Sequence, residues 1–218
     1  EFSNRGFRRF GFHGINHPHV SEAVAAQWRG QGKDPSQLRL ISAHLGAGAS
    51  LAAVKGGRCI DTTMGFTPLE GLVMATRSGN VDPGLLLELM REGYSEDQMA
   101  TILQKESGLK GLSGLSGDMR TIREAAASGH NGAIRALDVF RHRLLQLLGS
   151  MAASLGGVDV LALTGGIGEH DEQLKQELAT ALSWWGDFST VVIPADEEGM
   201  IARLCQRHSE TPASAAVG

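Results

Sequence analysis

The sequence predicts an α/β domain built on a mixed sheet that is flanked by helices. Three short apolar runs between residues 38 and 63 are separated only by glycine-containing turns, which is typical of an antiparallel meander. A long pattern of helical period then covers residues 131–155, and strand-like and helix-like segments alternate after it. A meander followed by alternating elements indicates a sheet in which antiparallel and parallel strands lie side by side.

The meander is expected to contain three strands that pair in chain order. The first covers residues 38–45 and ends at the small residues Gly46-Ala47-Gly48. The second covers residues 50–54, and a Lys-Gly-Gly-Arg turn at 55–58 leads into the third at 59–63.

Apolar residues spaced three and four positions apart predict four helices in the middle of the chain. These helices run from residue 83 to Gly93, from a Ser95 cap to Leu103, over residues 118–127 and over residues 131–155. The apolar stripe of the longest helix comprises Ile134, Leu137, Phe140, Leu144, Leu148 and Met151.

After the long helix, strands and helices are expected to alternate. The predicted elements are a buried strand at 158–163, a helix at 172–182, a strand at 190–193 and a helix at 197–206. We expect residues 1–207 to form one domain and residues 208–218, which are small and polar, to form a flexible tail. The first twenty residues lead directly into a histidine-containing loop without a strand to anchor it.

Net charge, cysteine content and apolar run length limit which partners and which cellular compartment are expected. The net charge of −4 gives no basic footprint for nucleic acid, so DNA and RNA are unlikely ligands. Cys59 and Cys205 lie far apart and outside any Cys/His motif, which fits a reducing cytoplasm better than a disulfide framework or a zinc site. No charged-then-apolar leader and no apolar run of membrane-spanning length is present, so neither a membrane anchor nor export is expected.

Two strand-like runs end in clusters of small residues, at residues 44–50 and 163–169. Neither cluster is a P-loop, because no Gly-Lys-Ser/Thr follows, and neither is the GxGxxG dinucleotide motif. Small residues directly after a buried strand let backbone N–H groups approach a phosphate or a nucleoside, and the second cluster precedes a helix whose N-terminus favours anions. Each cluster alone is more simply an ordinary tight turn, but two of them in one domain favour a nucleotide.

Residues 61–83 carry the most specific pattern in the chain. They resemble the acetate kinase family's Asp-Thr-Ser-Met-Gly-Phe-Thr-Pro-Leu-Glu-Gly-Leu, followed by Thr-Arg-Ser-Gly and an Asp-Pro pair. The segment Gly11–Gly14 resembles the family's Gly-Phe-His-Gly, and both glycine clusters match family loops in the same order. The resemblance implies a ribonuclease H-like, actin-like ATPase domain, as in sugar kinases, actin and the heat-shock ATPases.

The resemblance also implies a reaction, in which ATP and a short carboxylate such as acetate or propionate reversibly give ADP and an acyl phosphate by direct in-line transfer. His13 and Arg77 match the family's transition-state stabilisers, and donors of this kind suit the charge on a transferring phosphoryl group. On spacing alone, a loop histidine packed under Phe12 and a solvent-facing arginine would be the better interpretations, because the chain has eight histidines and many arginines.

Further site residues follow from the resemblance, position by position. The residues expected to contact nucleotide are His44, Leu45, Gly46, Ala47 and Gly48 at the phosphates, Asp118, Met119 and Arg120 at the nucleoside, and Gly166, Ile167, Gly168, Glu169 and His170 at the adenosine. Asp118 is equally well placed to cap the helix that begins there. Ala47 and His170 stand where the family usually has asparagine, which affects nucleotide affinity and base choice.

Metal and substrate contacts are implied in the same way. Glu197 matches a residue that helps to bind Mg²⁺, although an acid in the first turn of a helix is also favoured by the helix dipole. Phe12 and Pro68 match apolar residues beside the small acyl group, with plain packing as the alternative.

Family enzymes carry an upstream domain that supplies a phosphate loop, a metal-binding Asn, a substrate-clamping Arg and a catalytic Asp. We expect this chain to correspond to the C-terminal nucleotide-binding domain alone, to supply half of the active site, and to turn over little by itself. The alternatives are a non-catalytic ATP-binding module and a dimerisation module of the same fold. Family members form homodimers through this half, and the long helix from Asn131 offers a surface for pairing.

Overall fold

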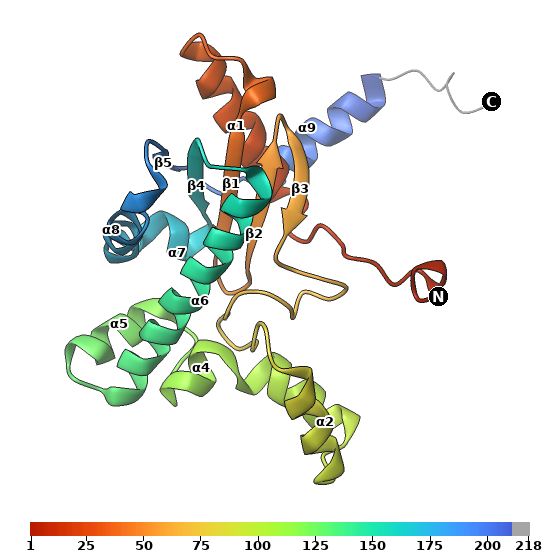
Figure 1. The fold of residues 1–218 in the computed structure, drawn as a ribbon, viewed down its shortest axis with the longest axis vertical. Helices are drawn as coiled ribbons and strands as arrows, with labels where there is room; N and C mark the ends of the chain where they lie inside the picture. Colours follow the sequence, from red (N-terminus) through yellow and green to blue (C-terminus); the bar gives the residue numbers. More distant parts are fainter. Residues whose placement is uncertain (211–218) are drawn as a thin grey trace.

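The computed structural model describes residues 1–210 and is organised around a mixed five-stranded sheet of order β3-β2-β1-β4-β5 (Figure 1). The strands are β1 (Arg39–Leu45), β2 (Ala49–Lys55), β3 (Arg58–Thr62), β4 (Val160–Thr164) and β5 (Ser189–Val192). The meander strands are antiparallel neighbours, whereas β4 pairs in parallel with both β1 and β5. The predicted fold class is therefore confirmed, including the order of antiparallel and parallel pairs.

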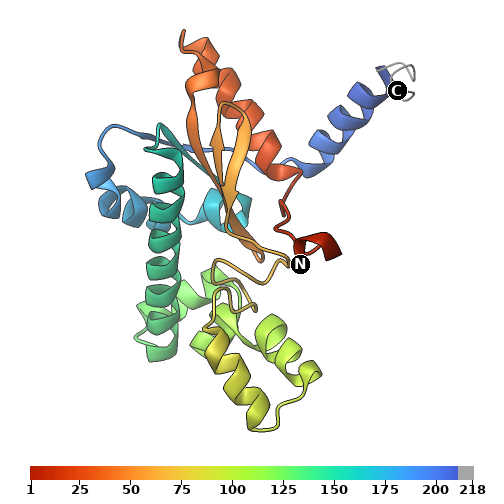
Figure 2. The ribbon, with the colours of Figure 1, turned by 45° about the vertical axis from the view of Figure 1, so that its right-hand side comes forward.

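Helices cover both faces of this sheet. The α-helices are α1 (Asn16–Gly30), α2 (Pro83–Arg91), α3 (Glu96–Thr101), α4 (Gly108–Ser113), α5 (Met119–Ala127), α6 (Asn131–Leu155), α7 (Gly165–His170), α8 (Glu172–Ala181) and α9 (Glu197–Glu210). The sheet lies between α6 on one side and α1 on the other (Figure 2). Within residues 1–210, no helix combines the length and the apolar character needed to cross a bilayer.

Alternation along the central strand separates two apolar cores. Ile41, Ala43 and Leu45 join the larger core beneath α6, whereas Leu40 joins the smaller core beneath α1. Successive side chains of a strand point to opposite faces, so β1 is buried on both. Ser42 and His44 also face α1; Ser42 is fully buried, and His44 Nδ1 is 2.9 Å from Asn16 Nδ2.

The long helix α6 matches its predicted bounds, but its apolar stripe is not a free surface. Phe140, Leu144, Leu148 and Met151 are buried in the larger core, while Ile134 near the start of the helix is 40% exposed. The expectation that this stripe offers a surface for pairing is therefore wrong for most of its length, because the sheet already covers it.

Helix α1 was not predicted. Its buried face consists of Asn16, His17 and Ser21 together with Val20 and Val24. Polar residues thus occupy buried positions, and the helix lacks the apolar stripe by which surface helices are recognised. The expectation of an unanchored loop over the first twenty residues is correct only up to Ile15.

Smaller differences occur at the ends of the other elements. Ser95 caps α3 in a capping box with Gln98, but α3 is followed by a π-turn over Ile102–Glu106. Helix α2 has no buried residue, so the apolar face predicted there contributes little to the core. Helix α9 continues through Glu210, so the flexible tail predicted for residues 208–218 is wrong for residues 208–210. The rest of that predicted tail lies outside the described residues.

Candidate active site

The two glycine clusters meet at one edge of the sheet. Strands β1 and β4 are parallel neighbours, and His44 lies opposite Thr164 in their register. Their carboxyl ends therefore open on the same edge, where ligands bind in open α/β sheets. Gly165 has φ +78°, and a Cβ there would lie 2.8 Å from the Leu45 carbonyl oxygen, so this close approach of the two loops requires glycine.

A cavity of about 720 Å³ opens beside these loops, between α5, α7 and the start of α8. Of the predicted nucleotide residues, those that line it are Gly46, Ala47, Asp118, Met119, Arg120, Gly166, Ile167 and His170. Six lining residues were not predicted from the sequence: Ala75, Gly117, Arg123, Asp171, Glu172 and Gln173. The volume is within the range of small-ligand sites, and segments distant in the sequence form its walls.

The other predicted nucleotide residues lie beside the cavity rather than on its wall. The Leu45 side chain is buried in the larger core, so only its backbone could face a ligand. Gly168 packs against Leu163. The Glu169 carboxylate accepts hydrogen bonds from the backbone N–H groups of Gly165 and Ala195, both at 2.9 Å, which gives it a structural role in holding the loop.

Asp118 combines both of the interpretations offered for it. Its carboxylate caps α5 by accepting hydrogen bonds from the backbone N–H and the hydroxyl of Thr121, at 2.9 and 3.0 Å. These bonds lower the pKa of Asp118, so the carboxylate is charged. Because the same side chain lines the cavity, capping does not exclude contact with a ligand.

His13 and Arg77 converge on Gly48, at the end of the phosphate-like loop. A Cβ on Gly48 would lie 3.4 Å from His13 Nε2 and 3.5 Å from Arg77 Nη1, so both donors face one small volume. Arg77 also donates to the carbonyl oxygen of Pro68 at 3.2 Å and is half-buried, which rules out the solvent-facing interpretation. His13 and Arg77 are 64 positions apart, so their spacing does not predict that they meet. Only the family resemblance placed them in one site.

The backbone at His13 is in the left-handed region, with φ +52°, and no other non-glycine residue of the described chain has a positive φ. Such a conformation costs about 1–3 kcal/mol and is most often found at functional positions. The neighbouring turn is tight as well, since a Cβ on Gly14 would lie 2.7 Å from the Gly11 carbonyl oxygen. The ring of His13 stacks on that of His44, with centroids 4.0 Å apart and planes inclined by 17°.

A buried cluster of histidines and hydroxyls lies behind His13. His13 Nδ1 is 2.8 Å from Ser50 Oγ, and the same oxygen is 2.9 Å from Nε2 of His17. His17 Nδ1 is in turn 2.8 Å from Ser42 Oγ. This cluster was not predicted from the sequence. Its only signal there is the separation of four positions between His13 and His17, about one helical turn.

The imidazoles of His13, His17 and His44 are neutral near pH 7. Burial lowers the pKa of His13 to about 4, with smaller contributions from the neighbouring His44 ring and from the Arg77 guanidinium. Burial likewise lowers the pKa of His17 to about 3. Burial also lowers the pKa of His44, although the carboxylates of Glu197 and Glu169 oppose this shift.

The predicted acyl-pocket residues Phe12 and Pro68 lie close to this centre. Phe12 is half-buried against the larger core, with its ring centroid 6.4 Å from that of Phe10. Pro68 is exposed, and its carbonyl oxygen holds Arg77. Packing therefore accounts for Phe12, and positioning of the guanidinium accounts for the backbone of Pro68.

Glu197 is the candidate metal ligand, and its surroundings fit Mg²⁺ chemistry in one respect. It is exposed in the first turn of α9, and its carboxylate lies close enough to His44 to oppose in part the lowering of the His44 pKa. Among the described residues, no group of three or more His, Cys, Asp or Glu side chains could hold a metal ion by itself. Mg²⁺ is usually bound by one or two carboxylates together with water and substrate phosphates, so a single carboxylate is compatible with it.

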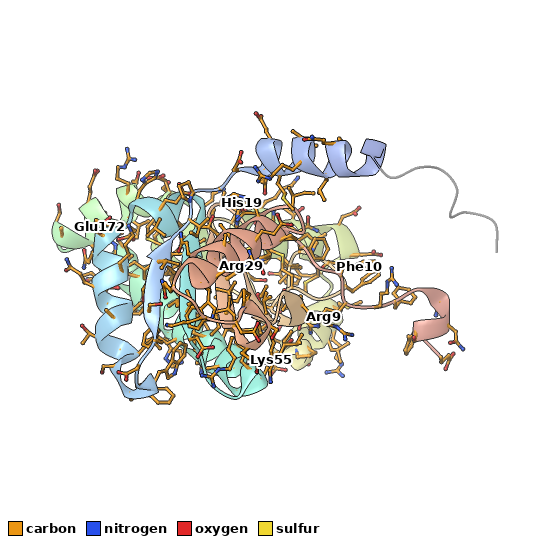
Figure 3. The ribbon with its side chains drawn as sticks, turned by 90° about the horizontal axis from the view of Figure 1, so that it is seen from above. Arg9, Phe10, His19, Arg29, Lys55 and Glu172 are labelled. Atoms are coloured by element: carbon orange, nitrogen blue, oxygen red, sulfur yellow. The ribbon has the colours of Figure 1, made fainter. Side chains whose placement is uncertain are left out.

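Helix α9 is held next to the site by contacts with α1. His19 lies beneath α9 (Figure 3), where its Nδ1 is 2.9 Å from Arg203 Nη2 and its Nε2 is 3.2 Å from the Pro194 carbonyl oxygen. Arg203 also forms an ion pair with Asp196 at 3.3 Å. These contacts fix where the first turn of α9 begins.

Arg123 ties together two walls of the cavity. From α5 it forms ion pairs with Asp171 at 3.0 Å and Glu177 at 2.8 Å, which belong to the start and the body of α8. All three side chains are at most 21% exposed. A guanidinium shared between two carboxylates in this way fixes the distance between the helices that line the cavity.

Comparison with known proteins agrees with this architecture. Residues 1–190 match the family model described as Acetokinase family. The chain is 53% identical over 186 residues to an acetate kinase of Acaryochloris marina, covering 85% of this chain and 46% of that protein. It is 50% identical, over an alignment of 231 residues, to an acetate kinase of Gloeobacter violaceus, covering 95% of this chain and 56% of the relative.

Solved structures give the same result. The crystal structure of Porphyromonas gingivalis acetate kinase has a TM-score of 0.89 and 37% identity, covering 95% of this chain and 57% of that one. A propionate kinase from Francisella tularensis has a TM-score of 0.83 and 34% identity, covering 92% and 56% respectively. The chain spans about half the length of the curated relatives that it matches.

Proposed function

Since this chain belongs to the acetokinase family, we propose that it binds ATP or ADP and takes part in phosphoryl transfer between ATP and a short carboxylate such as acetate or propionate. The observation that carries the proposal is the convergence of His13 and Arg77 on Gly48, the residue that follows the cavity-lining Gly46 and Ala47 in the chain. A mere ATP-binding module would need the cavity but not these two donors.

The nucleotide would lie along the edge of the sheet. Its nucleoside would occupy the cavity between Asp118 and the 166–170 segment, where an ionised carboxylate suits ribose hydroxyls. Its phosphates would follow Gly46 and Ala47, where small residues leave the backbone open. The terminal phosphate would then stand over Gly48, between the two donors.

The two donors would act on the charge of the transferring group. In-line phosphoryl transfer spreads charge over three equatorial oxygens and needs positioning and electrostatic stabilisation more than covalent help. Arg77 presents a planar fork of N–H donors that matches phosphate oxygens, and Pro68 holds it in place. His13 is neutral and would donate a single hydrogen bond through Nε2, the nitrogen that faces Gly48.

Glu197 would hold Mg²⁺, which when bound neutralises phosphate charge. The carboxylate substrate would approach the terminal phosphorus from the side opposite ADP. Because the chain spans about half the length of its relatives, we propose that it supplies one wall of the active site and that the region of the relatives it does not match supplies the other.

A chimera tests both parts of this proposal. The part of the Gloeobacter violaceus acetate kinase that this chain does not match would be joined to it, and acyl phosphate would be trapped as the hydroxamate. We expect the chimera to phosphorylate acetate or propionate and the 218-residue chain alone to turn over little. An active chain alone would contradict the division of the site, and a chimera that binds ADP without transfer would favour a non-catalytic module.

Arg77→Ala in the chimera then tests the assigned chemistry. It should lower kcat by about 10²-fold or more, as removal of a transition-state donor does, while the KM for ATP changes a few-fold. Arg91→Ala is the matched control, since it removes an exposed arginine of α2. Equal kcat in Arg77→Ala and the parent would remove Arg77 from its proposed role.

A further inference from the structure

A chain of hydrogen bonds runs from the interior of the sheet to the face of His13 that lies away from the site. It passes from Ser42 on β1 to His17 on α1, then to Ser50 on β2 and finally to His13 Nδ1, with heavy-atom distances of 2.8 to 2.9 Å. Ser42 and Ser50 are fully buried and His17 is 7% exposed. No water-exposed group is needed to complete the chain.

Each hydroxyl and each neutral imidazole in the chain has a single polar proton. Ser50 is fully buried between two rings, so its O–H must donate to one of them, and the direction of every other bond then follows. In one direction, Ser42 donates to His17 Nδ1, His17 Nε2–H donates to Ser50, and Ser50 donates to His13 Nδ1. His13 must then carry its own proton on Nε2. In the opposite direction, His13 carries the proton on Nδ1 and Ser42 receives the last bond.

Burial of Ser42 decides between the two directions. Among the described residues, its hydroxyl has no partner other than His17. In the second direction the Ser42 O–H would therefore be a buried donor without an acceptor, and leaving such a donor unsatisfied is costly. In the first direction every polar proton inside the chain is donated, and only the Nε2–H of His13 is left, facing Gly48.

We propose that Ser50 and His17 are positioning residues that fix His13 as the tautomer with its proton on Nε2. The use of that proton rests on the proposed function: at Gly48 it would meet a phosphate oxygen, whereas the other tautomer would present a lone pair to the same anion. The lowered pKa values of His13 and His17 agree with this assignment, since a neutral imidazole has only one N–H to place. The stacked ring of His44 and the left-handed backbone of His13 keep the ring plane fixed.

The tautomer can be measured directly on the 218-residue chain without nucleotide. Histidine-¹⁵N-labelled protein near neutral pH would be studied by correlating ring nitrogens with carbon-bound ring protons, which distinguishes the two neutral tautomers. We expect His13 to carry its proton on Nε2 in the parent. Ser50→Ala should shift His13 to a mixture of tautomers, whereas Ser50→Thr, which keeps the hydroxyl, should restore the parent pattern.

Two further variants distinguish loss of these particular hydrogen bonds from the general effect of deleting a buried hydroxyl. Ser113→Ala removes another buried hydroxyl, one that contacts only backbone groups of its own loop, and should leave His13 as in the parent. Ser42→Ala, at the far end of the chain of bonds, should also populate the second tautomer at His13. It serves as the independent test if Ser50→Ala does not fold.

Kinetics in the chimera complete the test. Ser50→Ala should lower kcat by about 10–100-fold, the range seen when a metal-ligating histidine loses the partner that fixes its tautomer, with the Kd for ADP unchanged. A parent with the proton on Nδ1, or Ser50→Ala and Ser42→Ala variants that both keep the parent tautomer, would overturn the proposal. An inactive chimera whose His13 still shows the Nε2–H form would contradict the proposed function and leave the tautomer assignment intact.

Discussion

Replacing His17 with asparagine should make the stability of this protein less sensitive to acid. The folded protein holds the His17 pKa at about 3 by burial, whereas an unfolded chain has the ordinary value of about 6.5. As the pH falls below 6.5, the unfolded state takes up a proton that the folded state does not. The stabilising contribution of neutral His17 is therefore fully present above pH 6.5 and is lost as the pH falls toward 3.

The magnitude follows from the width of this window. Each pKa unit corresponds to about 1.4 kcal/mol, so between pH 6.5 and 4.5 the parent should lose about 3 kcal/mol through His17. His17 is 7% exposed, so solvent screening reduces this figure little. A loss of this size is a substantial share of the ~5–15 kcal/mol by which domains are usually stable.

Urea unfolding of parent and His17→Asn at several pH values between about 7 and 4.5 would measure the effect through the linkage of protonation to folding. The variant should be the less stable at neutral pH, since it loses two hydrogen bonds, but its free energy of unfolding should fall by about 3 kcal/mol less across the window. His142→Asn, on the exposed side of α6, is the control for a histidine substitution as such and should match the parent at neutral pH. Parallel curves for parent and His17→Asn would refute the reasoning.

Three further substitutions test the walls and the end of the cavity. Gly166→Leu should raise the Kd for ADP by about tenfold or more, because the leucine side chain would fill the cavity. The urea midpoint should stay near the parent's, because a Cβ at this position meets nothing within 4 Å. Unchanged affinity in calorimetry would contradict this prediction. Arg123→Met should destabilise by about 3 kcal/mol, because it leaves the carboxylates of Asp171 and Glu177, which are 10% and 21% exposed, without their cation. Arg91→Met, which breaks an ion pair whose side chains are 71% and 57% exposed, should cost less than about 1 kcal/mol, and equal urea midpoints for the two would be the contrary result. Gly48→Ala should leave the fold intact but lower kcat of the chimera by about 10²-fold, because its methyl group would stand between the two donors; full activity would remove the phosphate from that position.

The sheet could be predicted from the sequence because its strands follow simple patterns. Alternating and continuous apolar runs located β1, β2 and β4 to within about a residue or two, and the stripe of α6 gave both of its ends. Helix α1 could not be found in this way, because the residues on its buried face near the site are Asn16 and His17. Where polar groups satisfy one another inside the protein, hydrophobic periodicity gives no signal.

The candidate site was predictable only in part, and for a related reason. The glycine clusters indicated open backbone after buried strands, but nothing in the spacing of His13 and Arg77 indicated that they meet. Ser50 and Arg123 were missed because their importance depends on three-dimensional neighbours: two imidazoles for Ser50, and two carboxylates of α8 for Arg123. The catalytic roles of His13 and Arg77, and the nucleotide contacts of the glycine clusters, remain predictions for the experiments above.

One carboxylate oxygen, Oε1 of Glu169, clasps two segments that are distant in the chain, the turn at Gly165 and the approach to α9 at Ala195. Replacing residues 165–170 with a segment that has no carboxylate at position 169 would break both hydrogen bonds and free the approach to α9. The smallest segment that can be exchanged with its contacts intact therefore runs from the end of β4 to Glu197. An insertion within it should be tolerated best between Trp185 and Phe188, away from Gly165 and Ala195.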